Sequence, residues 1–175
     1  ALHSFREAAQ VMIEFIARVQ KEYGIEIPEL DLGGGLGVAY LATDKPSSID
    51  DFAECTTRAV KDFCAEYGVA EPRILVEPGR SLVANAGVTL YTVGILKTLP
   101  GIRKYVAIDG GMSDNIRTAL YGAEYESVIA NKANQPRTKV VTLVGKHCES
   151  GDAVAADASI QNPDLGDIVC MFGPG

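Results

Sequence analysis

The first half of the chain is organised around the stretch Glu29-Leu-Asp-Leu-Gly-Gly-Gly-Leu-Gly37, a short run of alternating acidic residues and leucines that ends in a cluster of glycines. Such a run, bounded by Pro28 and by glycines, is typical of a strand followed by a loop. A second run, Arg73-Ile-Leu-Val-Glu77, is typical of a buried strand and is broken by Pro78 and Gly79. Because each run follows a helical pattern, this half predicts βα units with parallel strands.

Two amphipathic helices are predicted to precede these strands. The first runs from Ser4 to Tyr23, where apolar residues recur on one face, with Ser4 and Glu7 as a capping box and Gly24 as the stop. The second runs from near Ser48 to Gly68, again with its apolar residues on one face. The first half is therefore of the α/β class.

The second half of the chain has a residue pattern typical of strands. From Val88 onward, strand-like runs are separated by Gly, Pro, Asn and Asp, and only Asn115 to Tyr121 favours a helical turn or two. The predicted strands lie within Thr89–Leu96, Lys104–Ile108 and Thr138–Val144. We therefore expect a β domain, with the domain boundary near Ala84 to Ala86.

Composition excludes several classes of partner. A net charge of -7 argues against nucleic acid, because phosphate-backbone binding needs clustered Lys and Arg. No apolar run approaches the roughly 20 residues of a membrane-spanning helix, so we expect no membrane contact and a cytoplasmic location. The four cysteines form no CxxC pair and there are two histidines, so we expect no metal site and no disulfide framework.

The ends of the sequence suggest a piece of a longer protein. The chain opens directly on a predicted helix and stops at a predicted turn, Phe172-Gly-Pro-Gly175. Two βα units cannot close a (β/α)8 barrel.

The glycine cluster after the first strand favours a phosphate cradle, because glycines let the backbone bring its N–H groups close to an anion. It lacks the spacing of a dinucleotide fingerprint and the Lys of a P-loop. Taken alone, a glycine run is more often a tight turn. Glu77-Pro-Gly-Arg80 ends the next strand, and loops after successive barrel strands often share a phosphate site. The alternative for Glu77 and Arg80 is a buried salt bridge.

Four motifs, taken in order, resemble the diaminopimelate decarboxylase family. They are Gly33-Gly-Gly35, Glu77-Pro-Gly-Arg80, Asp109-Gly-Gly-Met-Ser-Asp-Asn-Ile-Arg-Thr-Ala-Leu-Tyr121 and Cys148-Glu-Ser-Gly-Asp152. The resemblance implies a TIM-type (β/α)8 barrel that binds pyridoxal phosphate, followed by a β-barrel or β-sandwich domain, in a homodimer. Residues 1–85 would form the last part of the barrel, and residues 86–175 would form part of the β domain.

The resemblance also implies cofactor-binding residues. Gly35 and Gly79 resemble the backbone donors to the cofactor phosphate, with Pro78 and Arg80 in the same loop. Glu77 resembles the carboxylate that faces the pyridine nitrogen and keeps it protonated.

Arg80, Arg117 and Tyr121 resemble the groups that hold the substrate, and an Arg fork suits a carboxylate. Cys148 and Glu149 resemble residues that the partner subunit inserts, as proton donor and as partner for the distal ammonium of the substrate. Without the resemblance, Arg117 and Tyr121 would be a surface pair four residues apart. A lone Cys is more often a small buried hydrophobe, which is our interpretation of Cys55, Cys64 and Cys170.

The implied activity is decarboxylation of meso-2,6-diaminopimelate to L-lysine. Two alternatives remain open: a related decarboxylase acting on ornithine, arginine or a carboxylated polyamine, and an inactive regulatory homologue. The lysine that holds the cofactor covalently in this family lies in a motif that this sequence does not contain. We therefore expect the 175 residues alone to be inactive.

Overall fold

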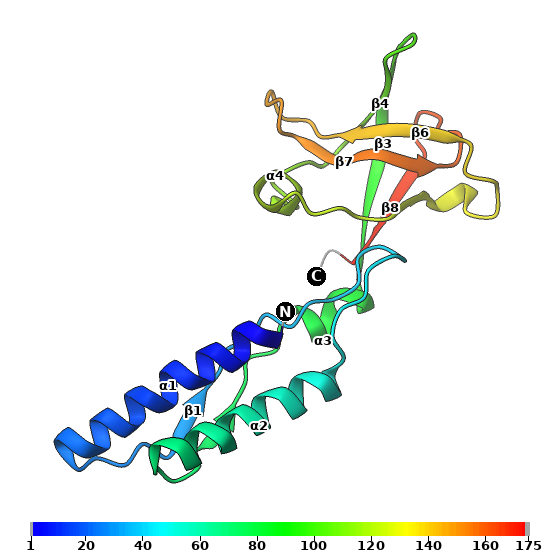
Figure 1. Ribbon diagram of the computed structural model, residues 1–175. Helices are drawn as coiled ribbons and strands as arrows, with labels where there is room; N and C mark the ends of the chain where they lie inside the picture. The colour runs from blue at the N-terminus through cyan, green and yellow to red at the C-terminus, as the bar shows by residue number, and fades with distance from the viewer. Residues whose placement is uncertain (1, 174–175) are drawn as a thin grey trace. The chain divides into compact units, whose positions relative to one another are not determined.

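The computed structural model describes residues 2–173, which form two compact units (Figure 1). Within the described residues, the first unit comprises 2–39 and 44–83, and the second comprises 40–43 and 84–173. The short Tyr40–Thr43 segment thus belongs to the second unit, although it lies in the first half of the sequence. The predicted turn at Phe172 to Gly175 extends beyond the described residues.

Two long helices dominate the first unit. They are α1 (Leu2–Tyr23) and α2 (Ile49–Tyr67), followed by the short α3 (Arg80–Val83). The ends of α2 confirm the prediction, since Ser48 caps its start and Gly68 ends it in the left-handed conformation. The predicted capping box of Ser4 and Glu7 is wrong, because nothing in Leu2-His3 breaks the helix and Ser4 lies inside α1.

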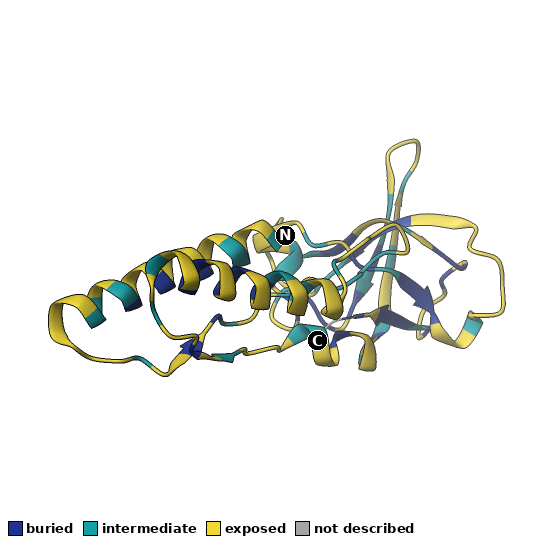
Figure 2. Cartoon of the chain, turned by 60° about the horizontal axis from the view of Figure 1, so that its bottom comes forward, coloured by how far each residue is buried: buried dark blue, intermediate teal, exposed yellow. Residues whose placement is uncertain are grey.

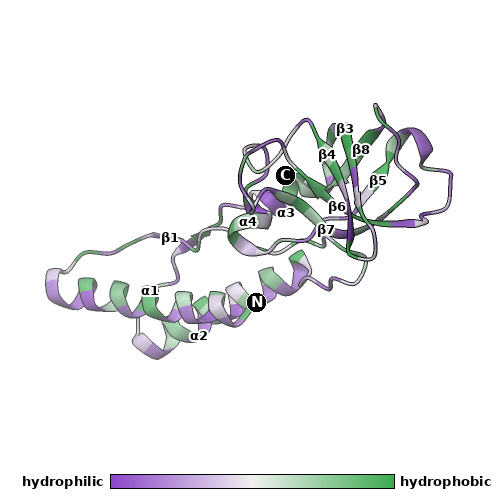
Figure 3. Ribbon diagram, turned by 90° about the horizontal axis from the view of Figure 1, so that it is seen from above, coloured by the Kyte–Doolittle hydropathy of each residue, from purple (hydrophilic) through white to green (hydrophobic). Residues whose placement is uncertain are grey.

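The core of the first unit lies between the apolar faces of α1 and α2. Figure 3 shows apolar and polar residues alternating along both helices, as an amphipathic helix requires. The buried side chains are Ala9, Ile13, Ile16, Leu30, Leu32, Ala59, Val60, Phe63 and Cys64. Strand β1 (Glu29–Asp31) pairs in parallel with β2 (Arg73–Leu75), which confirms the predicted parallel βα arrangement.

The second unit is a mixed six-stranded sheet. Its strands are β3 (Val88–Leu99), β4 (Arg103–Ile108), β5 (Ser127–Ile129), β6 (Lys139–Val144), β7 (Ala153–Ile160) and β8 (Ile168–Phe172). Their order is β5-β8-β3-β4-β6-β7, and β5 also contacts β7, so the sheet is nearly closed. The predicted fold class, α/β units followed by a β domain, is confirmed. The sequence prediction missed β5, β7 and β8.

The long strand β3 pairs with a different neighbouring strand along each of its halves. Its first half, from Val88 to Thr92, pairs with β8, and its second half, from Val93 to Leu99, pairs with β4. A register shift between Val93 and Ile95 separates the halves, and such an irregularity bends a strand. The curled sheet surrounds an apolar core that includes Tyr91, Val106, Leu143, Ile160 and Met171 (Figure 2).

The remaining elements are short connections in the second unit. They are the 3-10 turns η1 (Ala84–Ala86) and η2 (Ala130–Lys132), and the helix α4 (Arg117–Tyr121). Among residues 2–173, no helix has the length and apolar character that crossing a membrane requires.

A buried ion pair ties η2 to the loop before β8. The Asp167 carboxylate accepts hydrogen bonds from Lys132, from Asn131 Nδ2 at 2.7 Å and from the Asp164 amide at 2.7 Å. Burial by itself raises the pKa of Asp167, but these hydrogen bonds outweigh it and leave the pKa below its ordinary value. Lys132 also reaches Asp164 at 2.6 Å. The cluster therefore stabilises the fold in its ionised form.

Asp167→Asn should lower the free energy of unfolding at pH 7 by about 2 kcal/mol, because it removes a charged acceptor of several hydrogen bonds. A lowered folded-state pKa stabilises the fold above the unfolded value near 4, and that contribution disappears as the pH falls through the folded value. Urea titrations from pH 7 to pH 3 should therefore show a smaller acid-induced loss in the variant. Asp164→Asn, whose side chain is 70% exposed, should cost less than about 1 kcal/mol.

Candidate functional site

The loops that follow β1 and β2 lie together at the carboxyl edge of the parallel pair. The Glu77 amide donates to the Gly33 carbonyl at 2.8 Å, and the Leu32 amide donates to the Leu75 carbonyl at 3.0 Å. Within the first loop, the Gly33 amide donates to the Asp31 carboxylate at 2.8 Å. The structure thus brings the glycine motif and the Glu77–Arg80 motif into direct contact.

The glycine loop has no space for side chains at its centre. A Cβ added to Gly34 would lie 2.2 Å from the Glu77 carbonyl oxygen, far inside van der Waals contact. Gly33 and Gly35 have φ values of +70° and +100°, which L side chains rarely adopt. Both loops line one cavity of about 130 Å³, to which Gly33, Gly34 and Pro78 contribute.

The polar groups of these two loops are available to an anion. Arg80 has a buried Nε atom without a hydrogen-bond partner in the described part of the chain. Within residues 2–173, the amides of Gly35 and Gly79 donate no hydrogen bond to the protein. Glu77 is exposed and forms no ion pair with Arg80 there, so no buried salt bridge joins these two residues in the described part of the chain. Orphaned donors beside a glycine loop fit a phosphate group.

In the second unit, Arg117 and Tyr121 lie on α4. Asn115 is buried and precedes the helix, and its Oδ1 accepts the Arg117 amide at 3.2 Å. Gly122 ends the helix in the left-handed conformation. The Asp114 carboxylate accepts the Gly111 amide at 2.8 Å. Asp114 and Asn115 therefore act as turn residues before α4.

Arg117 is half-buried among aromatic rings. Its Nε donates to the Tyr125 hydroxyl at 3.1 Å. Its guanidinium carbon lies 5.4 Å from the ring centroid of Tyr121 and 5.7 Å from that of Tyr40. Tyr125 and Tyr40 were missed by the sequence prediction. A local signal existed for Tyr125, which follows the Arg117 motif by a few residues, but none existed for Tyr40.

Asp152 joins the loop of Cys148 and Glu149 to the loop before α4. Its carboxylate is 3% exposed and accepts the Met112 amide at 2.6 Å and the His147 amide at 2.8 Å. A Cβ added to Gly111 or Gly145 would lie 2.7 Å and 2.2 Å from this carboxylate. These five residues, Gly111, Met112, Gly145, His147 and Asp152, form an interlocking joint between the two loops. The sequence motifs did not reveal this joint, although its glycines were a visible signal.

The joint is extended by contacts between the same two loops. His147 Nε2 lies 2.9 Å from the Ser113 hydroxyl, and the Lys146 amide donates to the Gly110 carbonyl at 3.0 Å. The predicted third and fourth motifs thus form one local structure.

Cys148 differs from the buried cysteines in its environment. Cys148 and Glu149 are exposed at the tip of their loop, whereas Cys64 and Cys170 are buried. Burial raises the pKa of the Cys64 and Cys170 thiols, which agrees with their interpretation as small hydrophobes. Cys55 is half-buried, and its thiol donates to the Leu2 carbonyl. Of these thiols, Cys148 has the access that proton transfer to a ligand requires.

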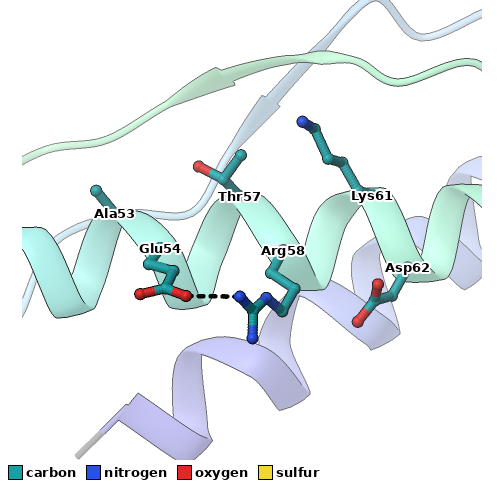
Figure 4. A pocket seen from close by; sticks show the side chains of 6 residues that line it. All are labelled: Ala53, Glu54, Thr57, Arg58, Lys61 and Asp62. Carbon is teal, nitrogen blue, oxygen red and sulfur yellow. Dashed lines mark hydrogen bonds and ion pairs between the residues drawn. The ribbon is translucent and has the colours of Figure 1, made fainter.

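A hollow on the outer surface of α2 offers no competing site. Figure 4 shows that its lining side chains all project from this one helix, with Arg58 paired to Glu54 at 2.6 Å. This is an ordinary pair of exposed residues four positions apart. In the described residues no group of three His, Cys, Asp or Glu side chains could hold a metal ion.

Comparison with known proteins identifies the class. The family model described as "Pyridoxal-dependent decarboxylase, C-terminal sheet domain" matches residues 13–175, and the chain belongs to this family. Diaminopimelate decarboxylase of Halalkalibacterium halodurans is 42% identical over 171 residues, which are 98% of this chain and 39% of that protein. The same enzyme of Bacillus subtilis is 43% identical over 168 residues, or 96% of this chain and 38% of that protein. The resemblance seen in the four motifs is confirmed.

Solved structures agree with this assignment. Diaminopimelate decarboxylase of M. jannaschii in complex with L-lysine has a TM-score of 0.85 and 32% identity, over 100% of this chain and 39% of that one. Lysine/ornithine decarboxylase of Vibrio vulnificus, complexed with putrescine, has a TM-score of 0.80 at 21% identity, which shows a shared fold alone. The chain spans about two-fifths of the length of these relatives.

Gly34→Ala should destabilise the protein by about 2 kcal/mol or more, because the added methyl group would displace the backbone at Glu77. Gly37→Ala is the matched control, since its added Cβ meets nothing within 4 Å. That variant should stay within about 0.5 kcal/mol of wild type in urea unfolding. Equal effects of the two substitutions would contradict the proposed contact.

Asp152→Asn should lower the free energy of unfolding by about 2–3 kcal/mol, because one acceptor oxygen becomes an amide group that faces a backbone N–H. Asp157→Asn serves as control, since Asp157 is exposed and has a φ of 49°, which Asn tolerates. Hydrogen exchange should also show faster exchange at the Met112 and His147 amides of the Asp152 variant. Unchanged exchange at both amides would argue against the joint.

Proposed function

We propose that the protein carrying this chain is a pyridoxal-phosphate-dependent decarboxylase that converts meso-2,6-diaminopimelate to L-lysine and CO2. The proposal is carried by two features that occur in a chain 42–43% identical to diaminopimelate decarboxylases. The first is the pair of glycine-containing loops beside the unpartnered Nε of Arg80, and the second is Arg117 packed against tyrosine rings. One arrangement suits a cofactor phosphate and the other suits a substrate carboxylate. We assign residues 1–85 to the end of a cofactor-binding barrel and residues 86–175 to part of a β domain.

The cradle residues would hold the cofactor. Gly35 and Gly79 would donate their amides to the phosphate, while Pro78 shapes the loop and the buried Nε of Arg80 gains an acceptor. The Glu77 carboxylate would accept a hydrogen bond from the protonated nitrogen of the pyridine ring. When bound, pyridoxal phosphate withdraws electrons from the carbon that loses CO2, and a carboxylate at Glu77 maintains that capacity.

The far end of the substrate, which carries a carboxylate and an ammonium group, would be held by protein side chains of the opposite charge. Arg117, with Arg80 and Tyr121, would bind the distal carboxylate, since a guanidinium fork matches a carboxylate in two hydrogen bonds. Glu149 would bind the distal ammonium. Ornithine has no distal carboxylate, so an arginine placed for one would remain unpaired at a cost in binding free energy. This favours diaminopimelate over ornithine.

Cys148 would donate the proton that replaces CO2. A thiol can serve as a general acid, because it carries a proton that it can give to a carbanion. We propose that Cys148 and Glu149 act in the site of the partner subunit of a homodimer, which their exposed loop would permit. The four cysteines are free, which suits a cytoplasmic enzyme.

The test is lysine release from meso-2,6-diaminopimelate by the full-length protein with pyridoxal phosphate, with ornithine and arginine as parallel substrates. Diaminopimelate should be turned over preferentially. Cys148→Ala should lower kcat by about 100-fold or more, because general acids contribute at least that factor. Cys55→Ala, which alters a half-buried thiol, should retain activity.

Other outcomes would redirect the proposal. Turnover of ornithine or arginine alone would keep the fold and the cofactor but change the substrate. No turnover of any of the three, with intact folding and bound cofactor, would favour a regulatory homologue.

A further inference from the structure

We propose that Tyr125 and Tyr40 are positioning residues that orient Arg117 toward a carboxylate and thereby set the preference for ligands whose far end carries one. The inference rests on the proposed function, in which Arg117 binds the distal carboxylate. All of these side chains belong to the second unit. The tyrosines act through Arg117 and do not need to contact the substrate themselves.

The hydrogen bond to Tyr125 fixes one edge of the guanidinium. The Nε of Arg117 donates to the Tyr125 hydroxyl at 3.1 Å. Within residues 2–173 the two terminal nitrogens of Arg117 make no hydrogen bond or ion pair with the protein. The terminal nitrogens are therefore free to present a pair of N–H donors, which is the geometry that binds a carboxylate in two hydrogen bonds. Anchoring through Nε orients this pair without occupying it.

Tyr40 and Tyr125 pack against each other, and both contact Arg117. Their rings meet edge to face, with centroids 5.1 Å apart and planes at 75°. Tyr125 is 5% exposed, and Tyr40 packs against the same apolar core. The Tyr40 ring also lies 5.7 Å from the guanidinium carbon, within the range of a cation–π contact. The Tyr40–Thr43 segment thereby supplies the second support of Arg117.

The charge of this cluster supports a role in anion recognition. In the described residues, no carboxylate lies in an ion pair with Arg117, although the side chain is half-buried. Ring faces and a neutral phenol hold the cation without neutralising it. A structural arginine in such a place would usually be paired with an acid. An unneutralised, oriented guanidinium favours an anionic ligand.

The first experiment compares L-lysine with L-lysinamide, which has the same shape but lacks the negative charge. Binding to the full-length holoenzyme is measured by calorimetry, alongside kcat and KM for meso-2,6-diaminopimelate. Tyr125→Phe keeps the ring but loses the acceptor of the Arg117 hydrogen bond. It should weaken lysine binding and raise KM about tenfold, the effect of losing one hydrogen bond to a charged group. Lysinamide binding and kcat should change less than about twofold.

A second pair of variants tests the ring of Tyr40. Tyr40→Leu should also weaken lysine binding selectively, and Tyr40→Phe should recover most of that loss because the aromatic ring returns. Tyr23→Phe, at a position 70% exposed on α1, controls for the loss of a tyrosine hydroxyl. Urea midpoints of all variants separate a loss of folding from a loss of recognition.

Three results would overturn the positioning role. They are equal weakening of lysine and lysinamide by Tyr125→Phe, no weakening of either, and wild-type protein that binds lysinamide as tightly as lysine. Selective weakening of lysine in a protein that does not decarboxylate diaminopimelate would keep the positioning role and reject the proposed reaction. The two proposals therefore fail separately.

Discussion

The buried carboxylate of Asp152 is the constraint on which the rest of the second unit's site depends. It accepts two backbone amides from different loops, and two glycines leave the space that it occupies. Because an unsatisfied buried carboxylate is costly, the loop of Cys148 cannot move away from the loop before α4 without losing both hydrogen bonds. The exposed thiol and Glu149 therefore project from a fixed base, although neither is itself buried. An exposed tip on a fixed base suits the proposed role of these residues in the site of a partner subunit.

In the first unit, two loops of the proposed site approach each other closely because glycines carry no side chain. Gly34 lies against the Glu77 carbonyl, and Gly33 and Gly35 have left-handed φ values. The two βα loops thereby lie close together beside a cavity that apolar side chains such as Leu36, Phe52 and Val76 also line. The buried Nε of Arg80 is left without a partner in the described residues. The two units share a polar side-chain group that has no charged partner in the described residues, the Arg80 Nε in one and the Arg117 guanidinium in the other. In the proposed function, the first would bind a phosphate and the second a carboxylate.

Much of this architecture could be predicted from local sequence. The caps of α2 at Ser48 and Gly68, the parallel pairing of β1 with β2 and the contact of their loops followed from hydrophobic period and strand ends. Strand β7 was missed because its alanine-rich run has no strong alternation, and β5 was missed because it has three residues. Tyr40 could not have been assigned, since its contact with Tyr125 joins positions far apart in sequence. Asp152 stood in a quoted motif, but its role depends on Gly111 in another loop and on Gly145 at the start of its own loop.

The most direct test is a crystal structure of the full-length protein with pyridoxal phosphate and L-lysine. We expect the phosphate against the amides of Gly35 and Gly79, the lysine carboxylate on the terminal nitrogens of Arg117, and Cys148 of one subunit beside the cofactor of the other. Phosphate bound away from both glycine loops, or a lysine carboxylate that does not contact Arg117, would contradict the proposed site.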